Sequence, residues 1–271
     1  MGAKKLPDIL GFQKLVLAAG VQHWRDMPWR QPEDSVQFDP YKILVSEIML
    51  QQTQVPRVAI KYQQFLNVFP TVNQLAKAPL ADVLRVWSGL GYNRRAKYLH
   101  DAAKQLASKE FWTYESLIAQ KGIGHNTAAA IRVYAYNEPH VFIETNVRSV
   151  FLHHFFQDKN DVSDKEILPL LEQALSSQNP RKFYWALMDY GTYLKQIQNP
   201  NVRSRSYVRQ ARFNGSLRQV RGAVIRELTS GHLDTTELTK RIHDQRLPMV
   251  LKVLTEEGLI QKTKRRYFLP R

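Results

Sequence analysis

Two glutamates stand in surroundings that could give them complementary chemical roles. Glu47 lies in the middle of a nearly continuous apolar stretch, residues 43–53, where burial would raise its pKa and keep the acid protonated. Glu144 follows an apolar run and precedes a helical pattern, so we expect it to face the positive end of a helix and stay ionised. Glycosidic bonds are cleaved by an acid that protonates the leaving group, together with an anion that stabilises the positive charge on the sugar. A buried ion pair for Glu47 and an ordinary helix cap for Glu144 are the plainer alternatives.

A short glycine-containing loop is the third candidate feature. Gly122-Ile123-Gly124 falls between two predicted helices, the second of which begins at His125. Glycine permits positive φ and lets a ligand approach the backbone closely, and amides at a helix start suit a phosphate group. Ordinary helix corners use the same pattern, so the loop taken alone does not identify a DNA-binding element.

The elements that must position these groups are predicted to be helical. Apolar residues at helical spacing predict helices over residues 8–24, 40–54, 58–68, 80–87, 94–108, 114–120, 125–136, 146–156, 164–177, 181–196, 217–229, 235–243 and 248–258. No alternating strand pattern precedes residue 250. Two short strands, 259–263 and 266–269, are expected to close the chain.

The C-terminal quarter differs from the rest in charge. The whole chain has 271 residues and a formal net charge of +15, and residues 201–271 carry 16 basic side chains against 6 acidic ones. Three helices and a basic ribbon are typical of a winged helix, with a helical cap that does not touch DNA as the alternative. We therefore predict a helical domain over residues 1–198, a basic linker over 199–214 and a winged-helix-like DNA-binding domain over 215–271.

Composition narrows the function further. A strongly basic chain often has an anionic partner, and nucleic acid is the first candidate. The chain has no cysteine, which excludes disulfides, thiol nucleophiles and cysteine-ligated iron–sulfur clusters. No apolar run approaches a membrane span, and the N-terminal residues do not resemble a signal peptide, so a cytoplasmic protein is expected. We further expect a monomer that associates with the nucleoid.

Several segments, taken in order along the chain, resemble those of MutY-type adenine DNA glycosylases of the helix-hairpin-helix superfamily. The most specific is Ser46-Glu47-Ile48-Met49-Leu50-Gln51-Gln52-Thr53-Gln54, and the resemblance covers residues 24–194. The others are Met27-Pro28-Trp29-Arg30, Asp39-Pro40-Tyr41, Phe69-Pro70-Thr71-Val72, Gly89-Leu90-Gly91-Tyr92, Gly122-Ile123-Gly124 and Ala186-Leu187-Met188-Asp189.

The resemblance implies a mainly α fold, with two helical lobes and a base flipped out of duplex DNA into the cleft between them. Glu47 matches the family's general acid, Glu144 the position of its catalytic Asp, and Asn146 a polar residue beside it. The base pocket and the wedge that enters the duplex are implied for Arg25, Trp29, Arg30, Gln51, Gln52, Tyr92, Asn126 and Trp185. The resemblance implies contacts to the DNA backbone at Gly122, Gly124, His125 and Thr127, and a monovalent cation on the carbonyls of this hairpin. We also expect the basic residues of the 203–212 segment to meet phosphates, among them Arg203, Arg205 and Arg209.

Departures from the family pattern bear on the substrate. Asn126 falls where bifunctional relatives place a Schiff-base lysine, which favours a monofunctional enzyme that leaves an abasic site. Trp185 falls where the family has a polar residue that reads adenine. Adenine opposite guanine or 8-oxoguanine is the expected substrate, and thymine or uracil opposite guanine is the alternative. A non-catalytic winged-helix DNA-binding protein on a retired glycosylase scaffold is the alternative from a different class.

Overall fold

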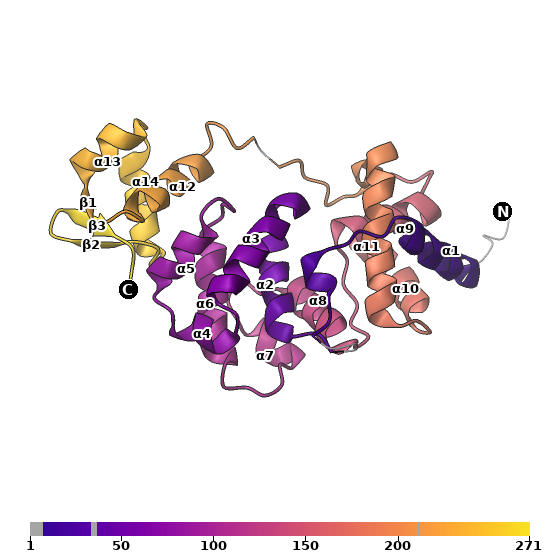
Figure 1. The fold of residues 1–271 in the computed structure, drawn as a ribbon. Helices are drawn as coiled ribbons and strands as arrows, with labels where there is room; N and C mark the ends of the chain where they lie inside the picture. The colour runs from indigo at the N-terminus through magenta and orange to yellow at the C-terminus, as the bar shows by residue number, and fades with distance from the viewer. Residues whose placement is uncertain (1–7, 34–36, 211) are drawn as a thin grey trace. The chain divides into compact units, whose positions relative to one another are not determined.

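The computed structural model describes residues 8–33, 37–210 and 212–271 (Figure 1). It consists of helices and one small sheet, which confirms the mainly α prediction. Contacts divide the chain into two compact units, and both are discontinuous in sequence. One combines the N-terminal residues up to Pro40 with His125–Arg209, and the other combines Tyr41–Gly124 with Gln210–Arg271.

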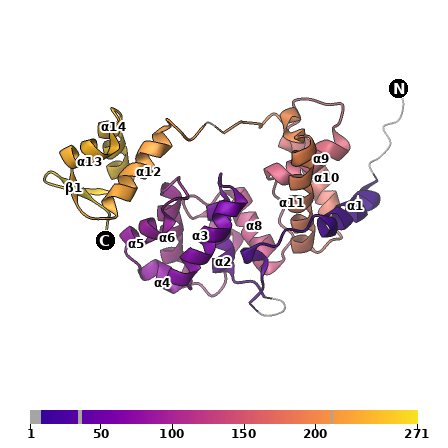
Figure 2. The same cartoon turned by 45° about the horizontal axis from the view of Figure 1, so that its top comes forward.

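The first unit is a helical bundle built around a long central helix. Its helices are α1 (Ile9–Gln22), α8 (His125–Tyr136), α9 (Thr145–Phe155), α10 (Asp164–Leu175) and α11 (Pro180–Ile197), with short 3-10 turns at Pro28–Arg30 and Pro200–Arg203. In both Figure 1 and Figure 2, α11 lies alongside α1 and α9.

Two glycines allow this close packing in the first unit. A Cβ added at Gly20 on α1 would lie 2.4 Å from the Cβ of Ala186 on α11. A Cβ at Gly191 would lie 2.2 Å from the carbonyl oxygen of Asn146 on α9. A side chain at either position would have to push helical backbones apart, which a close-packed interior resists.

The segment after α11 is folded onto the same bundle. The buried Asn201 amide donates to the Ser149 hydroxyl, and backbone hydrogen bonds of 2.9 Å join Val162 to Arg203 and to Arg205. Residues 199–205, the start of the predicted basic linker, are thus tied to α9 and to the loop before α10.

The second unit contains the remaining helices and the sheet. Its N-terminal part comprises α2 (Pro40–Leu50), α3 (Val55–Val68), α4 (Val72–Lys77), α5 (Leu80–Trp87), α6 (Arg94–Leu106) and α7 (Tyr114–Ile118). Its C-terminal part comprises α12 (Leu217–Leu228), β1 (Leu233–Asp234), α13 (Thr235–Ile242), α14 (Leu247–Glu256), β2 (Gln261–Thr263) and β3 (Arg266–Phe268). The strands form an antiparallel sheet in the order β1-β3-β2, with Tyr267 paired to both Leu233 and Lys262.

Specific contacts hold the two parts of the second unit together. The Ala81 amide on α5 donates to the Pro270 carbonyl at 2.8 Å. Glu257, after α14, forms ion pairs with Arg94 on α6 and Arg221 on α12.

The sequence prediction failed at two short elements. The expectation of no strand before residue 250 is wrong, because Leu233–Asp234 pairs with β3. Two residues are too few to show an alternating pattern, and a partner more than thirty residues away supplies the pairing. The helix Val72–Lys77 was also missed, since six residues give less than two turns of periodicity. No helix among the described residues is long and apolar enough to cross a membrane.

Candidate active site

Glu47 lies on the most deeply buried helix of the second unit. Along α2 every residue from Tyr41 to Met49 except Lys42 is buried, and Glu47 itself is 9% exposed. The sequence prediction that this apolar helix is buried is confirmed. Glu47 is therefore shielded from bulk water on a helix whose other buried side chains are mostly apolar.

The end of α2 is fixed by a buried arginine that the sequence analysis did not select. The Arg95 guanidinium donates to the carbonyls of Ile48 and Met49, at 2.9 Å each, and to that of Gln51. Its other nitrogen donates to the Thr53 hydroxyl at 2.9 Å. Burial lowers the pKa of Arg95 to about 10, so the group is still a cation at neutral pH. One side chain thus satisfies the free carbonyls at the helix end and fixes the turn that follows.

The predicted wedge residues lie at strained backbone positions. Gln52 has φ of 55° and Tyr92 has φ of 47°, values that non-glycine residues seldom adopt and that often mark functional sites. The neighbouring Gln51 donates its amide to the Gly122 carbonyl at 3.2 Å. This hydrogen bond joins the segment after α2 to the Gly122-Ile123-Gly124 loop.

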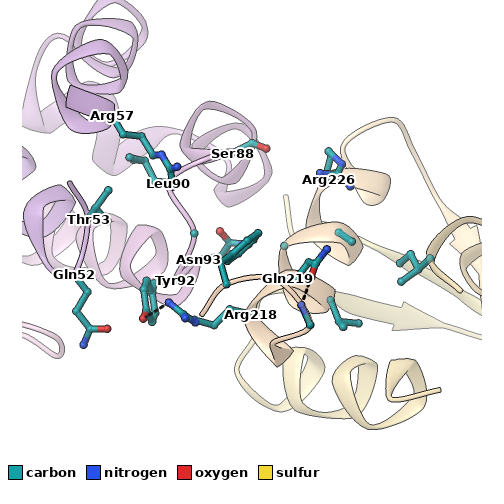
Figure 3. A pocket seen from close by; sticks show the side chains of 18 of the residues that line it. Gln52, Thr53, Arg57, Ser88, Leu90, Tyr92, Asn93, Arg218, Gln219 and Arg226 are labelled. Carbon is teal, nitrogen blue, oxygen red and sulfur yellow. Dashed lines mark hydrogen bonds between the residues drawn. The ribbon is translucent and has the colours of Figure 1, made fainter. Parts of the chain in front are cut away.

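Tyr92 is also held from the C-terminal part of the second unit. Its hydroxyl accepts hydrogen bonds from Arg218 at 2.6 Å and from Gln210 at 2.8 Å. Its ring lies between two guanidinium groups, with Arg95 at 5.3 Å and Arg218 at 5.1 Å from the centroid. Figure 3 shows Arg218 reaching across from α12 to the tyrosine.

Glu144 is the residue immediately before α9 in the first unit. Its side chain makes no capping hydrogen bond to the helix. Burial raises the pKa of Glu144 above its ordinary value, and the positive charge of Arg148 opposes that rise. The expectation of an easily ionised carboxylate is therefore wrong in direction, because loss of solvation outweighs the favourable helix end.

Three side chains hold the backbone that leads into Glu144. Asn126, in the first turn of α8, donates its amide to the Ile143 carbonyl at 2.9 Å, and the His125 ring contacts the Val141 carbonyl at 3.0 Å. The buried Tyr184 hydroxyl accepts from the Phe142 amide at 2.9 Å and donates to the carbonyl of the same residue. Asn126 and His125, predicted to face the base and the DNA backbone, thus have structural partners here.

Asn146 is the second residue of α9, two residues beyond Glu144. Its side-chain oxygen accepts from the Thr192 hydroxyl at 3.4 Å, and its nitrogen lies 3.5 Å from the Met188 sulfur. Both partners are on α11, which the absence of a side chain at Gly191 allows to approach.

The predicted base-pocket arginines form an ion cluster. Asp189 on α11 is 1% exposed and accepts from Arg25 Nε at 2.6 Å and from both terminal nitrogens of Arg30, at 2.7 and 3.0 Å. Arg30 is itself buried, with its guanidinium carbon 4.8 Å from the Trp24 ring centroid and 5.5 Å from that of Trp185. Asp189 belongs to a motif that the sequence analysis quoted, but nothing in the sequence indicated its partners.

The predicted tryptophans occupy aromatic surroundings. Trp29 is buried in the turn Pro28–Arg30. The Trp185 ring is in edge contact with Trp24 and Phe38, and is stacked on Tyr134 at a centroid distance of 6.2 Å. Trp185 thus lies in an aromatic cluster of the first unit, and its place in a base pocket stays a prediction.

The residues predicted to contact the DNA backbone differ in their partners. Gly122 has φ of 88° and lies against Tyr98, so its place requires glycine, whereas a Cβ at Gly124 would meet nothing within 4 Å. Thr127 lies in the first turn of α8. Arg203 donates to the Leu152 carbonyl at 2.9 Å, and Arg205 pairs with Asp161 at 2.7 Å. Arg209 is exposed. The first two arginines are therefore partly engaged within the protein.

The structure places the candidate residues in two sets. Glu47, Gln51, Gln52, Tyr92 and the hairpin glycines belong to the second unit, and Glu144, Asn146, Asn126, Arg25, Trp29, Arg30 and Trp185 belong to the first.

Comparison with known proteins places this chain in a family. A model of the HhH-GPD superfamily base excision DNA repair protein matches residues 45–176. The chain is 32% identical to an adenine DNA glycosylase of Mycobacterium tuberculosis (strain CDC 1551 / Oshkosh), over 88% of this chain and 86% of that one. It is 34% identical to an adenine DNA glycosylase of Buchnera aphidicola subsp. Baizongia pistaciae, over 65% of this chain and half of the relative's length.

Solved structures agree on the fold. A thermostable thymine-DNA glycosylase aligns with a TM-score of 0.56 and 22% identity, over 68% of this chain and 88% of its own. A trapped endonuclease III–DNA covalent intermediate aligns with a TM-score of 0.52 and 13% identity, over 79% of this chain and 94% of its own. The chain belongs to the adenine DNA glycosylase family within the HhH-GPD superfamily of base excision DNA repair proteins. It is a DNA N-glycosylase, an enzyme that cleaves the bond between a base and its sugar in DNA.

Proposed function

We propose that this enzyme excises adenine opposite guanine or 8-oxoguanine from double-stranded DNA and leaves an abasic site. The observation that carries the proposal is the burial of Glu47 on an apolar helix, within the motif most specific to the family. The naming of the mycobacterial and Buchnera relatives as adenine DNA glycosylases supports adenine as the base.

The reaction that these residues suit is a hydrolysis in two stages. Glu47 donates its proton to a ring nitrogen of the departing base as the bond between that base and C1′ of the sugar breaks. Glu144, in its ionised form, stabilises the positive charge that develops on the sugar. Burial leaves the Glu144 anion poorly solvated, which raises the pKa of the carboxyl group. The same poor solvation strengthens the attraction between the anion and a nearby cation. Water then adds to C1′, its oxygen forms the new bond, and its proton is released.

The absence of an amine at the Schiff-base position supports a monofunctional reaction. Asn126 occupies that position, and its amide nitrogen is engaged by the Ile143 carbonyl. An amide nitrogen is not a nucleophile toward the sugar, so strand cleavage by β-elimination through this residue is not expected.

Trp185 favours a second candidate substrate within the same class. Its ring is surrounded by Trp24, Phe38 and Tyr134, and it takes the place of the polar residue expected to read adenine. Thymine or uracil opposite guanine is therefore the alternative, since a pocket without that polar group loses a means of recognising adenine.

We propose that residues 215–271 bind DNA as a winged helix. The succession α12, β1, α13, α14, β2, β3 and the hairpin with Lys262, Lys264, Arg265 and Arg266 support this assignment. We further propose that the enzyme acts as a monomer on the chromosome in the cytoplasm. Sedimentation of the free protein and of its complex with one short duplex tests the monomer.

A monovalent cation on the hairpin carbonyls is part of the same proposal. The carbonyl oxygens of Gln120 and Gly122 each accept one hydrogen bond, from the Ile123 amide and the Gln51 amide, and a carbonyl has a second lone pair for a cation. Duplex affinity in potassium chloride compared with tetramethylammonium chloride at equal ionic strength tests the site.

A single-turnover assay on labelled duplexes tests the reaction. The panel holds adenine opposite guanine and opposite 8-oxoguanine, thymine and uracil opposite guanine, and hypoxanthine opposite thymine, each with and without alkali. Strand breaks from the adenine duplexes only after alkali would support the first proposal. Cleavage of the thymine and uracil duplexes instead would support the alternative, and no product from any duplex would favour a non-catalytic DNA-binding protein.

A further inference from the structure

A cleft of about 830 Å³ in the second unit extends beyond the residues assigned above to base excision and shares Gln52 and Tyr92 with them. One wall comes from the start of α3 and the loop between α5 and α6, and the other comes from α12 and the end of α13. Figure 3 shows Arg57 on the first wall and Arg218 and Arg226 on the second. The C-terminal domain is thus required to form the cleft.

The lining is strongly cationic. It contains five arginines, at 57, 218, 226, 241 and 246, and a single carboxylate, Asp244. Asp244 is already paired with Arg246 at 2.7 Å, and Arg241 pairs with Glu227. Arg57 and Arg226 are exposed, and neither has an ion-pair partner among the described residues. Two unneutralised guanidinium groups on opposite walls define a site for an anion with more than one charged group.

Near the strained positions Gln52 and Tyr92, the side chains that line the cleft include uncharged hydrogen-bond donors. Gln52, Tyr92 and Asn93 lie on the first wall, and Gln219 on α12 lies on the second. Amide and hydroxyl groups bind phosphate and sugar oxygens without reading sequence. The cleft therefore joins the residues predicted to enter the duplex with the basic C-terminal domain.

The helix that would read bases in a winged helix is poorly equipped for that role. On α14 the only basic side chain is Lys252, and it lies 4.0 Å from Glu256. The domain's helical arginines are on α12 and α13, and three of them line the cleft, Arg218, Arg226 and Arg241. Charge on this domain thus favours contact through the cleft over sequence reading by α14 in the major groove.

We propose that this cleft binds the sugar–phosphate backbone of one DNA strand beside the excised nucleotide. Arg57 and Arg226 contact phosphates from opposite walls, and the C-terminal domain contributes affinity without sequence preference. The proposal rests on the proposed DNA glycosylase function but assigns a strand-binding site separate from the excision chemistry.

The test compares two double variants that each remove two positive charges from the second unit. Arg57→Ala with Arg226→Ala removes the two exposed cleft arginines that have no ion-pair partner in the described part of the chain. Lys77→Ala with Lys109→Ala removes two exposed charges that do not line the cleft. Affinity for a lesion-free 25-base-pair duplex is measured from 50 to 200 mM salt, together with single-turnover excision at saturating enzyme.

Loss of two phosphate contacts lowers the slope of log K against log salt by about 1.8, because each contact contributes about 0.9. The affinity ratio of wild type to the cleft variant then narrows by about 12-fold from 50 to 200 mM salt. We expect this change in the cleft variant only, with the saturated excision rate within about twofold of wild type. Uncharged methylphosphonates placed in turn along the duplex should remove the difference at the bound phosphates.

An unchanged slope in the cleft variant, or an equal change in the lysine variant, would overturn the proposal. Because binding is measured on a duplex without a lesion, this result is independent of whether any base is excised. Failure of the proposed function would show as no product from wild type, while the slope comparison would still report on the cleft. Thermal melting of both variants checks folding, and among the described residues neither pair of substitutions removes a side-chain hydrogen bond.

Discussion

Replacing Asp189 by Asn should destabilise the first unit strongly. The carboxylate is 1% exposed and accepts four hydrogen bonds, two from Arg25 and two from Arg30. The substitution keeps the shape of the side chain but leaves two cations without a counter-charge, one of them 6% exposed. Removal of one partner from a buried ion cluster costs about 3–5 kcal/mol.

Urea unfolding, followed by circular dichroism, measures this loss. With an m-value of about 3 kcal/mol/M, the midpoint should fall by about 1–2 M. The control is Asp164→Asn, whose partner Arg148 lies at 2.7 Å but whose side chain is 41% exposed, so its cost should stay at or below about 1 kcal/mol. Equal losses in the two variants, or a loss below about 1 kcal/mol for Asp189→Asn, would refute the assignment of this cluster as a buried determinant of the first unit's stability.

Three other perturbations test the surroundings of Glu144 and the bundle beneath it. Tyr184→Phe removes the hydroxyl that serves both backbone groups of Phe142 and should cost about 1–3 kcal/mol in urea unfolding, with slower excision. Gly191→Ala places a methyl group against the Asn146 carbonyl and should cost at least about 1–3 kcal/mol by the same measurement, whereas an unchanged midpoint would mean that α9 and α11 are not in contact there. Burial and a neighbouring histidine lower the pKa of His154 to about 4, so its contribution to stability is present above pH 6.5 and is lost as pH falls toward 4. The melting temperature of His154→Gln should therefore fall less between pH 7 and pH 4.5 than that of wild type, and parallel curves would contradict the shift.

Sequence periodicity predicted the long helices because their apolar faces repeat over several turns. Residues 80–87 and 125–136 were predicted with the observed bounds, while α4 and β1 were too short to produce a pattern. Their formation depends on partners elsewhere in the chain, which a local window does not contain.

The candidate site was only partly predictable for the same reason. The motif around Glu47 identified a buried acid, since burial follows from the apolar residues on all sides of the helix. Arg95 and Asp189 could not be recognised, because their roles depend on carbonyls and guanidinium groups that are distant in sequence. The direction of the Glu144 pKa was wrong because the adjacent helix start is visible in the sequence and the desolvation is not.

The central claim is that Glu47 supplies the proton to the departing base, and the excision rate of Glu47→Gln tests it most directly. The substitution keeps the size of the side chain and removes the acid. Single-turnover excision of adenine opposite 8-oxoguanine should fall by at least about 100-fold, while duplex affinity stays within a few-fold of wild type. Glu110→Gln, a change at an exposed glutamate of the same unit, should excise at the wild-type rate. Excision by Glu47→Gln at the rate of Glu110→Gln would contradict the account.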